Sequence, residues 1–463
     1  MAAVDHATAI DELRAALGDK VSINASIREH HSKDESFHAP VVPDAVVFAA
    51  STDDVATALR ICNRHRTPVV AFGAGTSLEA NSTPIFGGVS LDLSRMDKVL
   101  RVSRDDLDCT VQAGVRRKQL NELLARDGLF FPVDPGADAT LGGMASTGAS
   151  GTTTVKYGAM KQLVLGLTVV MASGEVVTTA RRARKTSAGY DLTHVFVGAE
   201  GTLGVITELN LRVFGIPETI AAATVQFPAV RNAVDAVIEI VQMGIGVARS
   251  ELVCDKAVAA VNKYSGLSLP EQPMLLLEFH GTPASVALEV EAVRAIAESH
   301  GGFGYRETAD ESERRKLWQA RHDASTACRI GRKGSGRYAT DVCVPISRLS
   351  ECIEETLRDL DASGIYGPIV GHVGDGNFHV LLAVDHDDDD EVRRIDAFHS
   401  RLVRRAIEME GSCTGEHGIG VGKMEFLAQE LGDAAVSVMA QMKRALDPHN
   451  IMNPGKVIDE RYY

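Results

Sequence analysis

Several common sequence signals are absent from this chain of 463 residues. It has no uninterrupted run of about 18 apolar residues, so no segment is predicted to span a membrane. The formal net charge is −14, and the one basic cluster, at 181–185, is short enough to be a solvated loop. A nucleic-acid partner, which requires a basic face, is therefore not expected. Apolar residues make up 45% of the chain, as in an ordinary globular protein.

The cysteine pattern and the N-terminal segment exclude other classes. The chain has seven cysteines, an odd number, and none forms a Cys-x-x-Cys pair. This pattern is typical of reduced thiols in a cytosolic protein. Residues 1–20 carry neither a basic region followed by an apolar stretch nor an Arg-rich pattern, so no secretory or mitochondrial leader is expected. We predict a cytoplasmic location and leave open peripheral attachment to the inner membrane.

Length and patterning predict more than one domain, because a chain of this length exceeds what one hydrophobic core supports. A strand at 46–48, a helix at 52–65 and a strand at 67–72 form a β-α-β start. Pro217 marks a change to alternating strands and helices, which is typical of an α+β domain with an antiparallel sheet. The predicted α+β protein has three parts, at 1–216, 217–425 and 426–463.

Three glycine-rich loops are candidates for binding a ligand through the backbone. The first, at 73–77, follows a predicted strand and offers bare N–H groups and two hydroxyls, which can form an anion nest for a pyrophosphate. A plain turn explains this loop equally well when it is taken alone. It is not a dinucleotide fingerprint, because Leu78 stands where the third glycine is required, and no P-loop occurs. The second and third loops, at 135–151 and 198–204, favour close approach of a ligand.

A second candidate site lies in the segment 371–379, where two apolar runs flank a turn. Asp375 and Gly376 predict a two-residue hairpin turn, which would place His372 directly opposite His379. Cross-strand partners have Cβ atoms about 5 Å apart, close enough for two imidazoles to share a metal. The alternative is an ordinary hairpin in which the two histidines are incidental. Glu416 and His417, set in a glycine-rich turn, favour the metal site by adding an acid and a further histidine.

The three loops together resemble the FAD-binding domain of the vanillyl-alcohol oxidase and p-cresol methylhydroxylase superfamily. The segments 371–379 and 414–420 resemble signature segments of its D-lactate and D-2-hydroxyacid dehydrogenase branch. The resemblance extends over most of the chain, from about 28 to 456. It implies a two-part FAD-binding domain, a substrate or cap domain with an antiparallel sheet, and a C-terminal segment that returns to the FAD domain.

The resemblance also implies a role for individual residues. FAD would bind non-covalently, because no histidine lies in the expected loops. The implied FAD-binding residues are Gly73, Ala74, Gly75, Thr76, Ser77, Pro135, Gly136, Thr140, Gly142, Ser146, Gly148, Ala149, Gly198, Glu200, Gly204, Ile206 and Asn453. One divalent metal, zinc or manganese, would be bound by His372, His379 and Glu416. His372, His379 and His417 would also face the substrate. His417 is the implied general base, and Arg321 is the implied ligand of the substrate carboxylate.

One departure from the family pattern bears on the substrate. Relatives that act on dicarboxylates carry a Lys shortly before an Asp-x-x-x-Pro strand, where this chain has Ala339 before Asp341. No cation would then bind a distal carboxylate unless Arg337 turns inward. This favours a small monocarboxylate such as D-lactate over D-2-hydroxyglutarate.

Several alternatives and partners stay open at this point. A glycolate-oxidase-type subunit that requires partner chains, or a non-catalytic flavin- and metal-binding subunit, could carry the same motifs. A base next to a metal ligand argues against the non-catalytic subunit. An external electron acceptor is required, whether a quinone, a cytochrome or an electron-transfer flavoprotein. A homodimer is one assembly left open.

Overall fold

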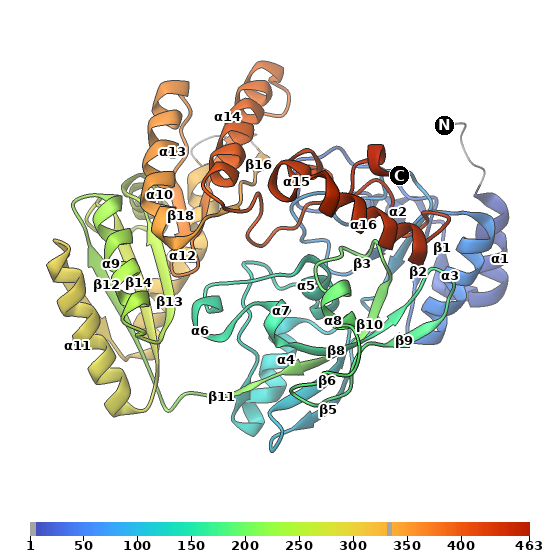
Figure 1. The fold of residues 1–463 in the computed structure, drawn as a ribbon, viewed down its shortest axis with the longest axis horizontal. Coiled ribbons are helices and arrows are strands. Elements are labelled where there is room, and N and C mark those ends of the chain that lie inside the picture. Colours follow the sequence, from blue (N-terminus) through green and yellow to red (C-terminus); the bar gives the residue numbers. More distant parts are fainter. Residues whose placement is uncertain (1–5, 331–335) are drawn as a thin grey trace. The chain divides into compact units, whose positions relative to one another are not determined.

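The computed structural model describes residues 6–330 and 336–463, which form two compact units (Figure 1). The first unit comprises Met1–Ser150, Ala159–Ile216 and Glu416–Tyr463. The second comprises Gly151–Gly158 and Pro217–Gly415. After Ile216 the chain therefore enters the main part of the second unit at Pro217.

Two differences from the predicted boundaries have clear causes. The chain returns to the first unit at Glu416 instead of 426, because the Glu200 carboxylate accepts the N–H groups of Ile419 and Gly420. Residues 151–158 join the second unit, because the Lys156 ammonium donates to the carbonyl of His280 at 2.7 Å.

The first unit begins with a four-stranded sheet in the order β1-β2-β4-β3. Its strands are β1 (Val21–Ser22), β2 (Ala45–Phe48), β3 (Val69–Phe72) and β4 (Val89–Asp92). Helix α3 (Thr52–His65) connects β2 to β3, and the Ser51 hydroxyl caps it by accepting the N–H of Asp54 at 3.1 Å. Because β2 and β3 both run parallel to β4, the predicted β-α-β start is confirmed. The loop 73–77 begins where β3 ends.

A five-stranded antiparallel sheet follows in the first unit, in the order β5-β6-β10-β8-β9. Its strands are β5 (Val99–Ser103), β6 (Asp108–Gln112), β8 (Val164–Val170), β9 (Val176–Thr178) and β10 (Val205–Arg212). The central strand β10 starts directly after the loop 198–204. Strands β6, β8 and β10 carry buried residues, whereas the edge strands β5 and β9 are more exposed.

Short elements complete the first unit. A small pair is formed by β7 (Leu129–Phe130) and β11 (Phe214–Gly215). The remaining helices are α1 (Ala7–Leu17), α2 (Ala25–His30), α4 (Arg117–Leu124), α5 (Leu141–Thr147), α7 (Met160–Leu163), α8 (Leu192–Phe196), α15 (Met424–Leu431) and α16 (Asp433–Leu446). None of the helices in the described part of the chain has both the length and the apolar character that a membrane crossing requires.

The C-terminal segment returns to the first unit as a short edge partner of β3. Val69 donates its N–H to the carbonyl of Ile451, and Asn453 donates to the carbonyl of Val69. The buried Lys443 ammonium secures this return by donating to the carbonyls of Thr202 and Met452, each at 2.8 Å.

The second unit is built on a seven-stranded antiparallel sheet in the order β15-β12-β14-β13-β18-β19-β17, as the sequence predicted. Its strands are β12 (Thr219–Gln226), β13 (Val247–Val253), β14 (Met274–Gly281), β15 (Phe303–Thr308), β17 (Val342–Cys343), β18 (Ile369–His372) and β19 (Asn377–Val380). A separate pair is formed by β16 (Gly336–Tyr338) and β20 (Leu382–Val384).

The two faces of this sheet differ in character. Leu252, Leu275 and Leu277 alternate onto one buried, apolar face. The opposite face carries Glu251 and Glu278, which accept hydrogen bonds from side chains of α12. The helices of this unit are α6 (Thr154–Tyr157), α9 (Val230–Gln242), α10 (Asp255–Ser265), α11 (Pro283–Ser299), α12 (Glu311–Ile330), α13 (Leu349–Ser363) and α14 (Asp389–Glu408).

Candidate metal and substrate site

His372 ends β18 and His379 lies in β19, but the hairpin differs from the predicted one. His372 pairs with Asn377, and His379 pairs with Val370, so a four-residue connection replaces the two-residue turn. The predicted register was wrong because the N–H of Val373 leaves the ladder and donates to the carbonyl of Ser250. The pairing is displaced by two residues, which preserves the face because side chains alternate with a period of two. The ring centroids are 5.6 Å apart.

Glu251 fixes the ring of His372. The two residues are direct partners across β13 and β18, and His372 Nδ1 lies 2.6 Å from Glu251 Oε1. Burial raises the pKa of the Glu251 carboxyl, but the charges and hydrogen bonds of His372 and Arg321 outweigh burial and leave the pKa lowered. With Nδ1 on the carboxylate, Nε2 is the nitrogen of His372 that can bind a metal.

His379 is oriented in the same way by a backbone acceptor. Its Nδ1 lies 2.9 Å from the carbonyl oxygen of Thr340, which again turns Nε2 toward the site. The buried Asp341 carboxylate lies beside it, with Oδ1 at 3.7 Å from Nδ1 and at 2.7 Å from the amide nitrogen of Asn377. Both histidines therefore have Nδ1 placed by an acceptor within the second unit.

Glu416 follows Gly415, whose backbone position is fixed by the same Asp341. The N–H of Gly415 and the hydroxyl of Thr414 each donate to Asp341 Oδ2 at 2.7 Å. The Ser150 hydroxyl donates to Glu416 Oε2 at 2.8 Å. The direction in which the chain leaves Gly415 thus places the Glu416 carboxylate near His379.

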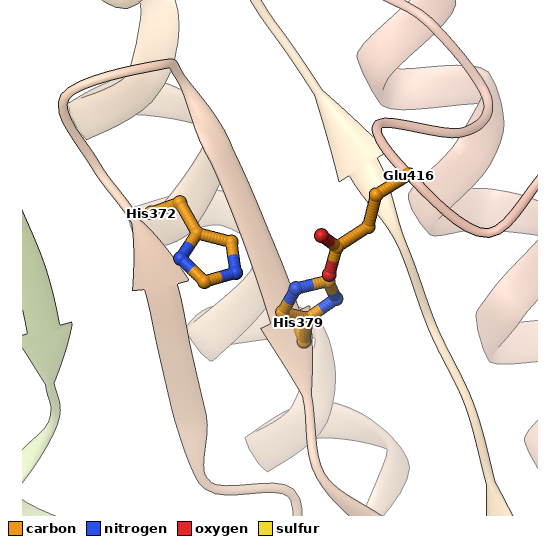
Figure 2. A group of neighbouring side chains, drawn as sticks. All are labelled: His372, His379 and Glu416. Carbon is orange, nitrogen blue, oxygen red and sulfur yellow. The ribbon is translucent and has the colours of Figure 1, made fainter. Parts of the chain in front are cut away.

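His372, His379 and Glu416 form one group whose ligand atoms all lie within 4.8 Å of one another (Figure 2). Two imidazole nitrogens and one carboxylate oxygen are a donor set that suits zinc or manganese and leaves coordination positions for a substrate. The residues fit a divalent metal, because both Nδ1 atoms have acceptors in the second unit and the three side chains bring their ligand atoms together.

His417 lies beside this group without belonging to it. Its Nε2 is 3.7 Å from Glu416 Oε1, and its side chain is 11% exposed. The backbone carbonyl of His417 accepts the Asn81 amide at 3.4 Å. The His417 ring therefore lies next to the Glu416 carboxylate.

Arg321 reaches the polar face of the sheet from α12, where the sequence alone would have made it a helix-surface residue. Its Nε and a terminal nitrogen lie 2.9 and 2.8 Å from Glu251 Oε2, and the side chain is 11% exposed. In the second unit, the Arg321 guanidinium and the His372 imidazole thus both contact the Glu251 carboxylate.

The three glycine-rich loops meet within the first unit. A Cβ added to Gly73 would lie 2.3 Å from Thr140 Oγ1, so the first and second loops touch here and a larger residue would have to displace the Thr140 side chain. The N–H of Gly198 donates to the carbonyl of Ala145 at 2.9 Å, which joins the third loop to the second. The three loops, which are far apart in sequence, are therefore neighbours in the first unit.

Glu200, which was predicted to bind FAD, has its carboxylate turned toward other parts of the protein. Oε1 accepts the backbone N–H of Ile419 at 2.6 Å. Oε2 accepts the backbone N–H of Gly420 at 2.9 Å and the side-chain amide of Asn81 at 2.5 Å. Burial raises the pKa of this carboxyl, although its three donors favour the charged form. Asn453, also predicted to bind FAD, donates its amide to the carbonyl of Glu200 at 2.7 Å.

Comparison with known proteins agrees with this geometry. A family model described as "FAD linked oxidases, C-terminal domain" matches residues 216–457, and one described as "FAD binding domain" matches residues 43–180. The chain belongs to the FAD-linked oxidases. This FAD-linked oxidase is 48% identical to the probable mitochondrial D-lactate dehydrogenase of Danio rerio, over 97% of its own length and 91% of the relative.

Two further matches support the assignment. The oxidase is 41% identical to the mitochondrial D-lactate dehydrogenase [cytochrome] of Arabidopsis thaliana, over 97% of its length and 80% of the relative. A structure of p-cresol methylhydroxylase with substrate bound shares the fold, with a TM-score of 0.82 at 19% identity and coverage of 98% and 97% of the two chains. The predicted family and fold are therefore confirmed, and the chain is an oxidoreductase homologous to D-lactate dehydrogenases.

Sequence reasoning missed two supporting residues of this FAD-linked oxidase. Glu251 had a weak signal, because its carboxylate directly precedes the apolar pair Leu252–Val253 in a buried strand. Asp341 had been noted only as part of a family segment, without a role. Neither position could be connected to the histidines without knowing the strand order, which brings β13, β17, β18 and β19 together.

Proposed function

We propose that this chain oxidises a small D-2-hydroxy acid, D-lactate to pyruvate, with non-covalent FAD and one divalent metal. The observation that carries the proposal is the grouping of His372, His379 and Glu416, with Arg321 held on the same carboxylate as His372. A metal-binding group beside a guanidinium is suited to a 2-hydroxy carboxylate, which offers a hydroxyl and a carboxylate on adjacent carbons.

The chain's own residues would bind and orient the substrate. The Arg321 guanidinium binds the carboxylate, and His417 Nε2 takes the hydroxyl proton as general base. His372, His379 and Glu416 hold the metal, and the glycine-rich loops hold FAD. When bound, the metal supplies positive charge that lowers the hydroxyl pKa, and FAD supplies the acceptor for the C2 hydride.

Ala339 supports a small monocarboxylate as substrate. It directly precedes Thr340, whose carbonyl oxygen accepts His379 Nδ1, so it lies close along the chain to the metal group. A methyl group at this position offers no cation for a second carboxylate. D-2-hydroxyglutarate is therefore expected to be a poor substrate.

The electron acceptor and the location remain predictions. The name of the Arabidopsis relative specifies a cytochrome, which makes a cytochrome the first acceptor to test among the three classes considered. Both relatives are mitochondrial by name, whereas the cysteine pattern of this chain predicts the cytoplasm. Whether the chain forms a homodimer is likewise untested.

The decisive experiment is anaerobic reduction of the bound flavin by a panel of 2-hydroxy acids. D-Lactate should bleach the flavin rapidly, with L-lactate, glycolate and D-2-hydroxyglutarate slower. Faster bleaching by L-lactate would contradict the assigned enantiomer, and activity only in the presence of partner chains would favour a glycolate-oxidase-type subunit. Flavin that remains with acid-precipitated protein would contradict non-covalent binding.

A further inference from the structure

Glu251 lies at the centre of the polar face of the second unit's sheet. Its side chain is fully buried, and each of its two carboxylate oxygens has a different kind of partner. Oε1 lies 2.6 Å from His372 Nδ1, and Oε2 lies 2.8–2.9 Å from two nitrogens of Arg321. One carboxylate therefore contacts both a candidate metal ligand and the candidate substrate-binding cation.

We propose that Glu251 is a positioning residue that holds the His372 ring and the Arg321 guanidinium in a fixed orientation relative to each other. The proposal rests on the proposed function and assigns a role to a residue that touches neither metal nor substrate. The proposal is based on two observations: the Glu251 side chain is 0% exposed, and Glu251 on β13 pairs directly with His372 on β18.

The His372 side of this contact controls metal affinity. An acceptor on Nδ1 selects the tautomer that presents Nε2 and prevents the ring from rotating. Loss of such an acceptor typically weakens metal binding by about 10–100-fold.

The Arg321 side controls how the substrate carboxylate is bound. Two nitrogens on one edge of the guanidinium are held by Oε2, which leaves the remaining N–H groups of the planar fork in a fixed direction. Because a planar fork binds a carboxylate through paired donors, a change in its tilt weakens substrate binding more than it alters the chemical step.

A neighbouring cluster supplies a matched control. Glu278 lies on the adjacent strand β14 and faces the same side of the sheet, with its oxygens 2.8 Å from His280 Nε2 and 2.5 Å from Trp318 Nε1. It is also a buried glutamate with a histidine and an α12 side chain as partners. His280 is not a member of the metal group, so the two clusters share their chemistry and differ in the proposed role.

The test compares Glu251→Gln with Glu278→Gln in FAD-loaded protein. Glutamine has one acceptor oxygen and cannot serve both His372 and Arg321. Zinc and manganese dissociation constants, measured by chelator competition, should rise about 10–100-fold in Glu251→Gln and stay near wild type in Glu278→Gln. At saturating metal, the KM for D-lactate should rise in Glu251→Gln by a larger factor than kcat falls.

Each outcome bears on the proposal. Wild-type metal affinity in folded Glu251→Gln protein, or an equal loss in Glu278→Gln, would overturn it. If Glu251→Gln fails to fold, the pair Glu251→Met with Arg321→Met leaves no uncompensated buried charge and still removes the acceptor from His372. Unchanged metal affinity in that pair would also refute the role of Glu251. Absence of metal binding in the wild type would instead count against the proposed function.

Discussion

Glu200 in the first unit and Glu251 in the second are both buried glutamates next to candidate site residues, but they bind different parts of the chain. Glu200 accepts two backbone N–H groups and an amide, so it fixes the path of the loop that follows His417. Among the described residues, the donors to Glu251 are the side chains of His372 and Arg321, so Glu251 fixes the orientation of two functional groups. A buried carboxylate that accepts backbone N–H groups mainly fixes the path of a loop. One that accepts side-chain donors mainly fixes the orientation of the groups that bind metal or substrate.

The largest expected effect separates metal binding from FAD binding. His379→Ala removes one of the three candidate metal ligands and should abolish stoichiometric metal binding while the flavin content stays normal. Flavin reduction by D-lactate should fall by about 10³–10⁴-fold, because the metal supplies several kcal/mol of charge stabilisation. Elemental analysis and stopped-flow absorbance measure the two effects. Full activity in metal-free His379→Ala protein would contradict the metal site.

The next effect tests the base that follows Glu416. His417→Ala should retain both FAD and metal and lose about 10²–10⁴-fold in the rate of flavin reduction, which is typical of general-base loss. If His417 only packs the turn, the variant would instead lose metal or thermal stability at a normal rate of reduction. Rates must therefore be measured on protein with known metal and flavin content.

Glu200→Gln sharpens the comparison between the two glutamates. One carboxylate oxygen becomes an NH2 group, which leaves backbone N–H groups of the loop without an acceptor and should lower the free energy of unfolding by about 1–3 kcal/mol. Metal affinity should change far less than in Glu251→Gln. Urea denaturation and chelator competition provide the readouts, with Glu208→Gln as the control because Glu208 lies on β10 and is only half-buried. Loss of FAD in parallel with stability would show a direct cofactor contact instead.

The smallest expected effect is a pH dependence in the first unit. Burial lowers the pKa of Lys456 from 10.5 to about 7, so between these values the unfolded chain binds a proton that the folded protein does not. The free energy of unfolding should therefore gain a contribution that grows as pH rises from about 7 to 10. Lys456→Met should remove that part of the slope, which denaturation at several pH values measures by difference. An identical slope in both proteins would show that Lys456 stays charged when folded.

The sequence predicted the elements that carry strong local patterns and missed relations between distant strands. The β-α-β start and the antiparallel second sheet follow from periodicity and turn residues. His372 and His379 were correctly placed on one face, although the register was wrong, because a displacement of two residues leaves alternation unchanged. The bond from Glu251 to His372 depends on the pairing of β13 with β18, which no local pattern encodes.

The discontinuity of the first unit has a consequence for how the protein matures. During synthesis most of the second unit, Pro217–Gly415, emerges before the last segment of the first unit, Glu416–Tyr463. Until that segment leaves the ribosome, the carbonyl of Glu200 lacks its Asn453 donor and the N–H of Val69 lacks its Ile451 acceptor. The first unit is therefore completed only after residues 416–463 have been synthesised, and we expect stable flavin binding to follow their emergence.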